Sequence, residues 1–284
     1  MSRLLLFIVL CVSVVSWQPD SFAGGPLKVT ALGKINTDKD ETDPFLASDN
    51  KTLLFATDRD GTWDVYASKR NPSRLQWNDS DPLSTNTKDA DERSPLFQPG
   101  KYVYFSSNRV PDPAFKDLKN FDIYQQSGPR APSAMLRVST GADEMYPWVA
   151  SKEKEFYFNR KTDDGFRLFV SKGPALGPAD EGTLVKEIPA GFVHPTITPD
   201  GKTMYLQGPL EGGKTGIFRS KRVGDKWSEP KAVINLIHPE CKRGDFSPSL
   251  SASGTTLFFA SDRPNGAGGL DLYYVRTASL NVQE

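Results

Sequence analysis

The sequence predicts an all-β protein, a single five-bladed β-propeller with four antiparallel strands in each blade. Three observations lead to this prediction. First, a unit of about 50 residues recurs along the chain, which is a typical spacing of propeller blades. Second, each unit holds short runs of β-branched and aromatic residues between turn-forming residues, and no long helical period is present. Third, the last unit is one strand short, whereas a spare strand-like segment precedes the first unit.

The units are aligned by a proline at the start of the first strand of each one. These prolines are Pro44, Pro95, Pro147, Pro195 and Pro248, at separations of 51, 52, 48 and 53 residues. We therefore expect blades at residues 41–86, 92–139, 144–189, 192–236 and 245–277.

The first unit shows the expected order of strands. An inner strand follows Pro44 at residues 45–48, and a polar turn separates it from a second strand at residues 52–57. The third strand covers residues 63–68, and a weaker outer strand covers residues 74–83. The outer strands of the next three units are expected at residues 135–138, 183–188 and 227–234.

The fifth unit ends soon after its third strand. Residues 27–36 (LKVTALGKIN) are the spare segment, and we expect them to form the outermost strand of the fifth blade. This pairing joins the two ends of the propeller and removes an exposed sheet edge.

The first 23 residues are predicted to be a secretory signal peptide, which leaves the propeller at residues 24–284. Arg3 precedes an apolar run at residues 4–17, and small residues stand at Ser21 and Ala23, where a signal peptidase reads the chain. The alternative is a membrane anchor, but this run is shorter than the roughly 20 residues that span a bilayer. We expect a periplasmic or secreted protein with no transmembrane segment after cleavage.

The charge and histidine content limit the possible functions. Lys plus Arg and Asp plus Glu both number 35, so the chain lacks the basic footprint of a nucleic-acid-binding protein. With only His194 and His238, it offers little material for a histidine-rich zinc site or for Ser-His-Asp catalysis. We predict no cofactor, while a bound cation such as calcium stays open.

The repeats resemble those of the TolB-type, WD-like propeller family. The shared pattern is S-P-x-x-S-x-D-G-K-x-L-x-F-x-S-D-R…D-I-Y, and it is clearest in residues 247–275 and 198–206. The resemblance covers essentially all of residues 24–284 and implies a propeller. TolB itself has six blades and an additional N-terminal α/β domain, so this chain is similar to a TolB-type propeller and not to TolB as a whole. Such repeats occur in binding proteins and in carbohydrate enzymes, so the resemblance implies no single function.

Acidic residues recur at one position of the repeat and make the main candidate site. Three residues before each proline stand Glu41, Glu92, Glu144, Phe192 and Asp245. Because the following strand is innermost, we expect these side chains near one mouth of the central channel. Unpaired carboxylates there would bind a metal ion, an amine, a basic peptide or a sugar. Alternatively, each acid accepts backbone N–H bonds within its own turn.

The residues directly before the prolines vary from blade to blade, as expected of a site held by a common scaffold. Of these residues, Asp43, Tyr146 and His194 complete the candidate site. His194 is either a general base or ligand, or a satisfied polar residue of the channel wall. Carboxylates that point into an open pocket lined by Tyr146 or Trp148 would indicate a sugar site, because sugar rings stack on aromatic faces.

A second recurring feature is an arginine followed by an aspartate between the second and third strands. We expect three structural clamps, Arg59 with Asp64, Arg109 with Asp122, and Arg263 with Asp271. Blades three and four lack the pattern, since they carry Thr162 with Arg167 and Leu210 with Gly216. The loop at residues 107–120 is longer than its equivalents, and long loops on a rigid scaffold often carry binding.

Two functions fit these features. The first is a non-enzymatic scaffold that binds an envelope or extracellular protein or peptide. The second is a glycosidase-like enzyme, which needs two carboxyl groups roughly 5–10 Å apart and could use Asp43 with the ring acids. The sequence favours binding, because similar acids recur in blade after blade, whereas catalysis needs two carboxyls in distinct environments. A carbohydrate is a further possible ligand.

Overall fold

A computed structural model describes residues 27–71, 76–98, 102–110, 120–150, 152, 154–172 and 180–282. The predicted signal peptide and most of the predicted long loop at residues 107–120 lie outside these ranges. Within them, no helix is long and apolar enough to span a bilayer.

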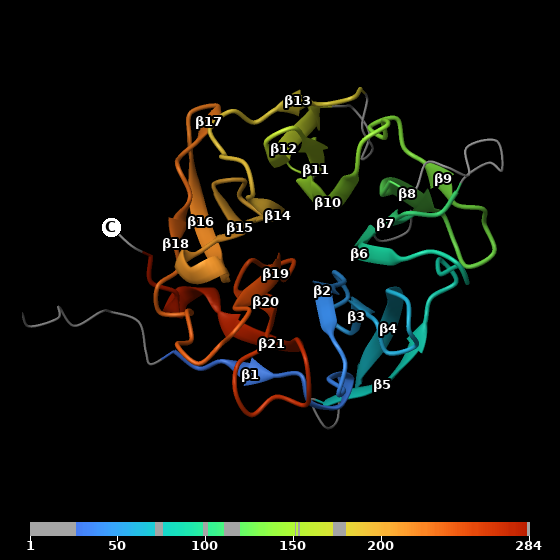
Figure 1. Cartoon of the computed structure of the whole chain (residues 1–284), viewed down its shortest axis with the longest axis horizontal. Coiled ribbons are helices and arrows are strands. Elements are labelled where there is room, and N and C mark those ends of the chain that lie inside the picture. The colour runs from blue at the N-terminus through green and yellow to red at the C-terminus, as the bar shows by residue number, and fades with distance from the viewer. Residues whose placement is uncertain are drawn as a thin grey trace, which may run out of the picture.

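Five antiparallel sheets are arranged as blades around a central axis (Figure 1), which confirms the predicted fold. Blade one contains β2 (Glu41–Leu46), β3 (Thr52–Thr57), β4 (Asp64–Asn71) and β5 (Gln76–Pro82). Blade two contains β6 (Glu92–Gln98), β7 (Tyr102–Ser107), β8 (Asp122–Gln126) and β9 (Ala134–Met135). Blade three contains β10 (Glu144–Ala150), β11 (Glu155–Thr162), β12 (Gly165–Lys172) and β13 (Thr183–Leu184).

The last two blades differ in their outer strands. Blade four contains β14 (Val193–Ile197), β15 (Thr203–Pro209) and β16 (Thr215–Val223), and two short segments, β17 (Lys226–Trp227) and β18 (Lys231–Ala232), pair with β16. Blade five contains β19 (Asp245–Leu250), β20 (Thr256–Ser261) and β21 (Asp271–Arg276). Single turns of 3₁₀ helix are η1 (Gly33–Ile35), η3 (Glu211–Gly213) and η4 (Thr277–Ser279).

The N-terminal segment closes the ring, as predicted. In β1 (Thr30–Ala31), Thr30 lies opposite Tyr274 and Ala31 opposite Tyr273, so β1 is the outer strand of blade five. The chain then passes through η1, whose Ile35 is fully buried between blades five and one. Through this closure, the outer edge of blade five pairs with a strand that continues along the chain into blade one. Blades one and five therefore lie side by side (Figure 1).

The core lies between the blades. In β3 every residue after Thr52 is buried, because one face of the strand packs on blade five and the other on blade two. A strand with two buried faces has a continuous run of apolar residues. For this reason apolar and polar residues do not alternate in most of TLLFAT.

Each inner strand contains the same irregularity. The register to the second strand shifts around the proline in all five blades. The residue before the proline has a left-handed backbone, with φ of 54° at Asp43, 54° at Ser94, 59° at Tyr146, 59° at His194 and 51° at Ser247. Non-glycine residues adopt this conformation rarely, and a bulge of this kind redirects the side chain. All five side chains are thereby placed at the centre of the ring.

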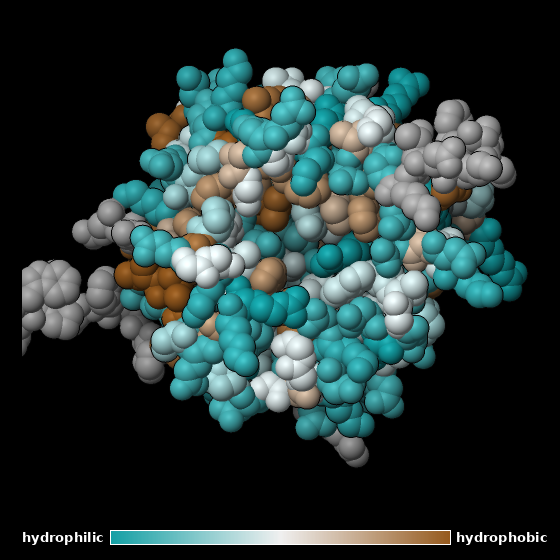
Figure 2. Space-filling model, in the orientation of Figure 1, coloured by the Kyte–Doolittle hydropathy of each residue, from teal (hydrophilic) through white to brown (hydrophobic). Residues whose placement is uncertain are grey.

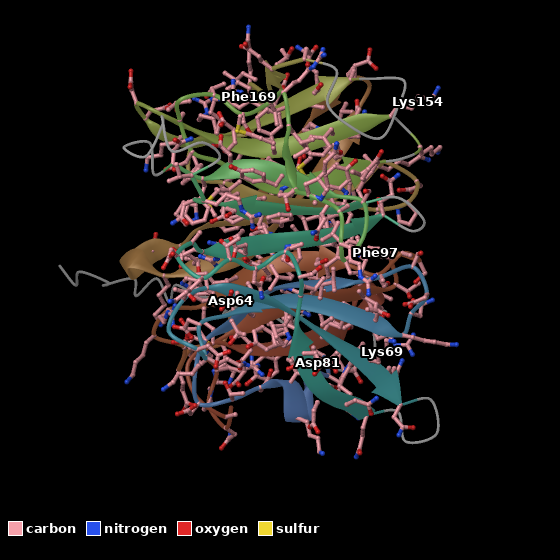
Figure 3. The ribbon with its side chains drawn as sticks, turned by 90° about the vertical axis from the view of Figure 1, so that its right-hand side faces the viewer. Asp64, Lys69, Asp81, Phe97, Lys154 and Phe169 are labelled. Carbon is pink, nitrogen blue, oxygen red and sulfur yellow. The ribbon has the colours of Figure 1, made fainter. Side chains whose placement is uncertain are left out.

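The two faces of the propeller carry different parts of the inner strands. Asp64, at the start of β4, lies toward the left-hand face in Figure 3, whereas Lys69 and Phe97 lie toward the right-hand face. We call the first face, on which the inner strands begin, the entry face, and the second the exit face. Hydrophilic residues cover most of the surface shown in Figure 2.

Candidate functional site

The four predicted ring acids are buried on the entry-face side of the blades. Glu41, Glu92 and Glu144 are 0 % exposed and Asp245 is 2 % exposed, so none of them lines open space. Each glutamate accepts hydrogen bonds from a threonine that precedes it in the chain. The backbone N–H donors are Thr37 at 2.7 Å, Thr87 at 3.0 Å and Thr140 at 2.8 Å. The structure therefore favours the alternative in which each acid ties down its own connecting turn.

An arginine completes each of these acid sites. The guanidinium nitrogens lie 3.2 Å from Glu41 (Arg59), 2.9 Å from Glu92 (Arg109), 2.6 Å from Glu144 (Arg160) and 2.7 Å from Asp245 (Arg263). Each arginine also lies over two aromatic rings of its blade. Arg109, for example, lies 4.8 Å from the centroid of Phe105 and 5.0 Å from that of Tyr124. We call this unit of acid, arginine and two aromatic rings the blade clamp.

The arginine partners differ from those predicted. Arg59, Arg109 and Arg263 do belong to clamps, but the structure pairs them with the ring acids and not with Asp64, Asp122 or Asp271. The reason is that each arginine, two residues past the end of its strand, folds back over the blade toward the inner strand.

The three aspartates have other contacts. Asp64 accepts a hydrogen bond from the Thr62 hydroxyl at 3.2 Å. Asp271 accepts the backbone N–H groups of Ala267 at 2.7 Å and Gly268 at 3.5 Å. One carboxylate oxygen of Asp122 is buried without a partner among the described residues.

Blade three keeps the clamp from a different sequence position. Arg160 lies directly opposite Glu144 in the β10–β11 ladder, whereas the other arginines come two residues after the opposing position. The sequence pattern therefore missed it, because Thr162 occupies the position where an arginine was sought.

Blade four replaces the clamp with apolar packing. Phe192 takes the place of the acid and Leu210 the place of the arginine. The ring of Phe192 packs edge-on against Phe218, with centroids 5.0 Å apart. Gly208 and Gly216 leave the space that Phe192 and Leu210 fill, since a Cβ on either glycine would lie within 2.7 Å of those side chains.

Burial governs the protonation of three ring acids. It raises the pKa of Glu41, Glu92 and Asp245 above the usual range, although their arginine and hydroxyl partners act in the opposite direction. Acids held in this way are neither free ligands for a cation nor exposed to a substrate.

Asp43 differs from the ring acids because it connects four blades. Its carboxylate accepts hydrogen bonds from Arg93 Nε at 3.2 Å, the Ser94 backbone N–H at 3.0 Å and the Ser247 hydroxyl at 2.7 Å, and it lies 3.0 Å from His194 Nε2. Burial alone would raise the pKa of Asp43, but Arg93 and His194 together lower it well below the usual range. Since an ionised carboxylate only accepts hydrogen bonds, His194 donates through Nε2.

Of the seven predicted site residues, the structure brings together Asp43, Tyr146 and His194. The rings of Tyr146 and His194 lie 4.3 Å apart, and both side chains are partly exposed at the entry face. Arg93 was not predicted, although it directly precedes one of the central residues in the repeat. The group formed by Asp43, Arg93, Tyr146, His194 and Ser247 is called the central cluster, and it lies near the start of the inner strands.

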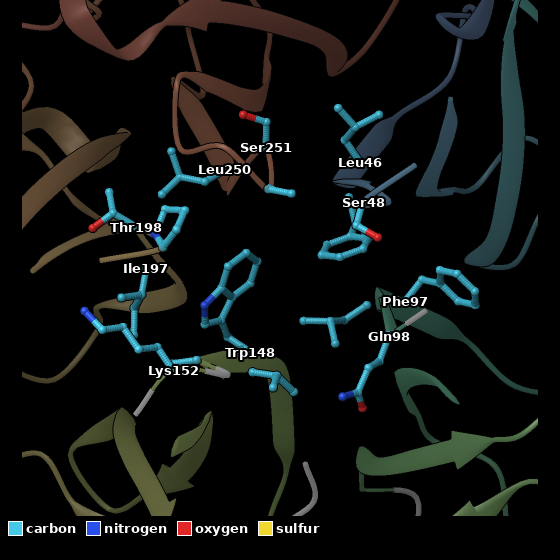
Figure 4. Close-up of a pocket in the computed structure, with 16 residues that line it drawn as sticks. Leu46, Ser48, Phe97, Gln98, Trp148, Lys152, Ile197, Thr198, Leu250 and Ser251 are labelled. Atoms are coloured by element: carbon cyan, nitrogen blue, oxygen red, sulfur yellow. The ribbon is translucent and has the colours of Figure 1, made fainter. Parts of the chain in front are cut away.

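The channel is narrow behind the central cluster and widens toward the exit face. The inner space beside Asp43, His194 and the five prolines measures only about 20 Å³. Beyond it, the last residues of the inner strands enclose a funnel of about 380 Å³ (Figure 4). Its apolar wall includes Leu46, Leu96 and Leu250, and Trp148 projects into its centre.

Two residues that line the funnel carry buried polar atoms without partners in the described part of the chain. Among the described residues, the indole N–H of Trp148 and the side-chain carbonyl of Gln98 are buried without a hydrogen bond. Trp148 and Tyr146 thus serve opposite mouths, because Pro147 and the bulge separate them. Sequence reasoning named Trp148 as a possible pocket residue but did not identify the funnel, since the apolar ends of the inner strands resemble ordinary core.

The described residues contain no group of three or more His, Cys, Asp or Glu side chains arranged to hold a metal ion. The ring acids lie apart, each with its own arginine.

Sequence and structure comparisons give different results. No family model matches the chain, and no curated protein matches its sequence. Two similar structures are TolB-like. TolB from Acinetobacter baumannii has 16 % identity and a TM-score of 0.53, with 87 % of this chain covered but only 56 % of that chain, so this chain spans about half its length. The putative TolB from Agrobacterium tumefaciens has 14 % identity and a TM-score of 0.54, with 91 % and 88 % covered.

A third similar structure is an enzyme. The catalytic domain of the GH62 α-L-arabinofuranosidase from Coprinopsis cinerea has 10 % identity and a TM-score of 0.59, with 92 % of this chain and 99 % of that chain covered. At these identities the similarity shows the propeller fold alone, and that fold is shared by TolB-like proteins and glycoside hydrolases.

Proposed function

We propose that the protein is a non-enzymatic binding scaffold that takes up an apolar segment of a partner protein in the funnel. The observation that carries this proposal is the funnel itself, whose volume of about 380 Å³ falls within the range of small binding pockets, about 300–1,000 Å³. The candidate interface thus moves from the acid-bearing entry face to the exit face.

The chemistry of the funnel matches a peptide. A tryptophan in an apolar recess is a common anchor of a protein interface, because it offers a large apolar surface with one N–H donor. Leu46, Leu96 and Leu250 form an apolar wall around Trp148, and such a wall suits an inserted apolar side chain of a peptide.

The partner is proposed to be a protein or peptide of the cell envelope or the extracellular space. This location rests on the predicted signal peptide at residues 1–23, and it requires that the propeller act in the periplasm or after secretion.

The test is capture of partners from envelope extract by purified protein, followed by affinity measurement with the captured partner. Trp148→Ala is expected to lower the affinity for that partner at least about 30-fold, because the loss of an interface anchor costs about 2 kcal/mol of binding free energy. Met135→Ala is the matched control, because Met135 is 48 % exposed on an outer strand. A partner that binds both variants equally well contradicts the proposal.

A glycosidase at the entry mouth is the second candidate. It is favoured by the ionised Asp43 beside the partly exposed His194, and by the shared fold with a glycoside hydrolase. Against it, the ring acids that were to supply the second carboxyl are each held by an arginine. We expect no turnover on a panel of aryl glycosides and polysaccharides. Turnover that disappears in Asp43→Asn would establish the enzyme instead.

A further inference from the structure

A second cavity lies at the seam where the N-terminal strand closes the ring. It measures about 590 Å³ and runs between blade one and blade five, and Trp148 is not among its lining residues. Its walls come from β1 and η1, from the outer strands of blade one at Arg70 and Trp77, and from blade five at Phe258 and Tyr274. We call it the seam groove.

The seam groove is positively charged. Its lining includes Lys34, Arg70 and Arg276, and none of the described residues that line it is an Asp or Glu. Lys34 lies 3.8 Å from Asp79, but both side chains of this ion pair are exposed and it holds little energy. An unbalanced group of cations in a recess attracts an anion.

Arg70 is the strongest sign of a ligand. Its Nε is buried and has no hydrogen-bond partner among the described residues, in contrast to the clamp arginines, which are all paired. A buried donor without an acceptor costs free energy, so an oxyanion placed there would satisfy it.

The remaining lining defines the body of the ligand. Hydroxyl and amide side chains form most of the polar wall; they are Thr30, Asn50, Gln76, Ser251, Ser253, Thr255 and Thr256. Trp77, Phe258 and Tyr274 form its aromatic part. Such a wall suits a ring with several hydroxyl groups on its edge and C–H groups on its face.

We propose that the seam groove binds an acidic sugar, with the carboxylate at Arg70 and Arg276 and the ring hydroxyls at the serine and threonine side chains. The site adjoins the funnel at Leu46 and Ser251, which line both cavities, but Trp148 does not line the seam groove. Because the groove includes β1 and η1, the bound sugar also holds the closing strand against blades one and five.

Titration calorimetry of the purified chain with tri-galacturonate tests the proposal, with D-galactose and inorganic phosphate as comparison ligands. Tri-galacturonate is expected to bind, and its affinity should fall as salt is added because salt screens the charges. D-galactose should not bind. Arg70→Gln and Arg276→Gln are each expected to weaken binding about tenfold or more. Lys69→Gln, on an exposed neighbour of Arg70, is the charge-matched control and leaves binding unchanged.

Thermal unfolding provides a second readout. Tri-galacturonate should raise the unfolding midpoint of the wild type and of Trp148→Ala, but not of Arg70→Gln, because a ligand of the folded state stabilises it. Arg276 is exposed, so Arg276→Gln is expected to fold. It therefore tests the proposal even if Arg70→Gln does not fold. The proposal is overturned if no uronate binds, if D-galactose or phosphate binds as tightly, or if both arginine variants bind normally.

Discussion

In blades one, two, three and five, an arginine lies over two aromatic rings and reaches a buried acid, whereas in blade four Phe192 and Leu210 fill the equivalent places. The opposing residues change with them. Blade two places Ser107 and Asp122 where blade four has Gly208 and Gly216. The structural task at this position is to fix the inner strand to the blade, and either an ion pair or apolar packing performs it.

This difference separates structural repetition from a site. The ring acids recur because the blade clamp recurs, and blade four shows that the ring closes without a fifth acid. The residues before the prolines vary instead, and only they meet at one point, around Asp43. Asymmetry among equivalent positions is therefore a better guide to the central cluster than the shared acids are.

The largest effect is expected from breaking one clamp. Arg109→Met leaves Glu92 buried without its guanidinium partner and should lower the free energy of unfolding by about 3–5 kcal/mol. Urea unfolding, followed by tryptophan fluorescence, measures this change.

The matched control installs the blade-four solution in blade two. The quadruple variant Glu92→Phe, Ser107→Gly, Arg109→Leu, Asp122→Gly exchanges the buried pair for apolar side chains and supplies both glycines that make room for them. It should lose much less free energy of unfolding than Arg109→Met, because replacing a whole buried pair is often near neutral. If the quadruple variant is the less stable of the two, the blades are not equivalent.

The converse change crowds blade four. A Cβ at Gly208 would lie 2.4 Å from the ring of Phe192, which is itself packed on Phe218. Gly208→Ala should therefore cost about 1–3 kcal/mol of unfolding free energy. Gly128→Ala is the control, since a Cβ there meets nothing within 4 Å, and its urea midpoint should not fall. Equal midpoints for the two variants would show that Phe192 moves freely.

The fold could be predicted from the sequence because its signals are local and repeated. The five prolines mark the start of each blade. The last strand of blade five, which contains Tyr274, lacked an outer neighbour, and only the segment before Glu41 could supply one. The blade clamps were harder to assign. Arg59 lies near Asp64 in sequence but 18 residues from Glu41, and charge alone does not choose between them. Only the path of the side chain over Phe55 and Tyr66 decides.

A pH titration tests the behaviour of a buried acid that has no arginine partner. Burial, reinforced by the nearby charge of Glu144, raises the pKa of Asp122 to about 6. The folded state then keeps a proton that the unfolded chain, with a pKa of about 3.9, has released. Unfolding releases this proton between about pH 4 and pH 6, so the free energy of unfolding falls as pH rises through that range.

Asp122→Asn should flatten that part of the stability profile, measured as urea midpoints from pH 4 to pH 7. Asp79→Asn is the control, because the Asp79 side chain is 93 % exposed. A wild-type slope that persists in Asp122→Asn would assign the titration to another acid.

The smallest effect should come from an ion pair outside the blade clamps. Arg243 donates to both oxygens of Asp40, at 2.9 Å and 2.8 Å, and so links blade five to blade one. Its side chain is 48 % exposed, whereas that of Arg109 is 15 % exposed. Solvent weakens the charge interaction and rehydrates the remaining aspartate, so Arg243→Met should cost only about 0.5–1 kcal/mol.

Salt distinguishes the exposed pair from the clamp more sharply than geometry does. At an ionic strength of about 1 M the screening length falls to about 3 Å, and the cost of Arg243→Met should approach zero. The cost of Arg109→Met should persist, because salt does not screen a charge that solvent does not reach. If high salt removes both costs, the clamps are held by long-range charge and not by burial, and the equivalence between an ion pair and the Phe192–Leu210 pair fails.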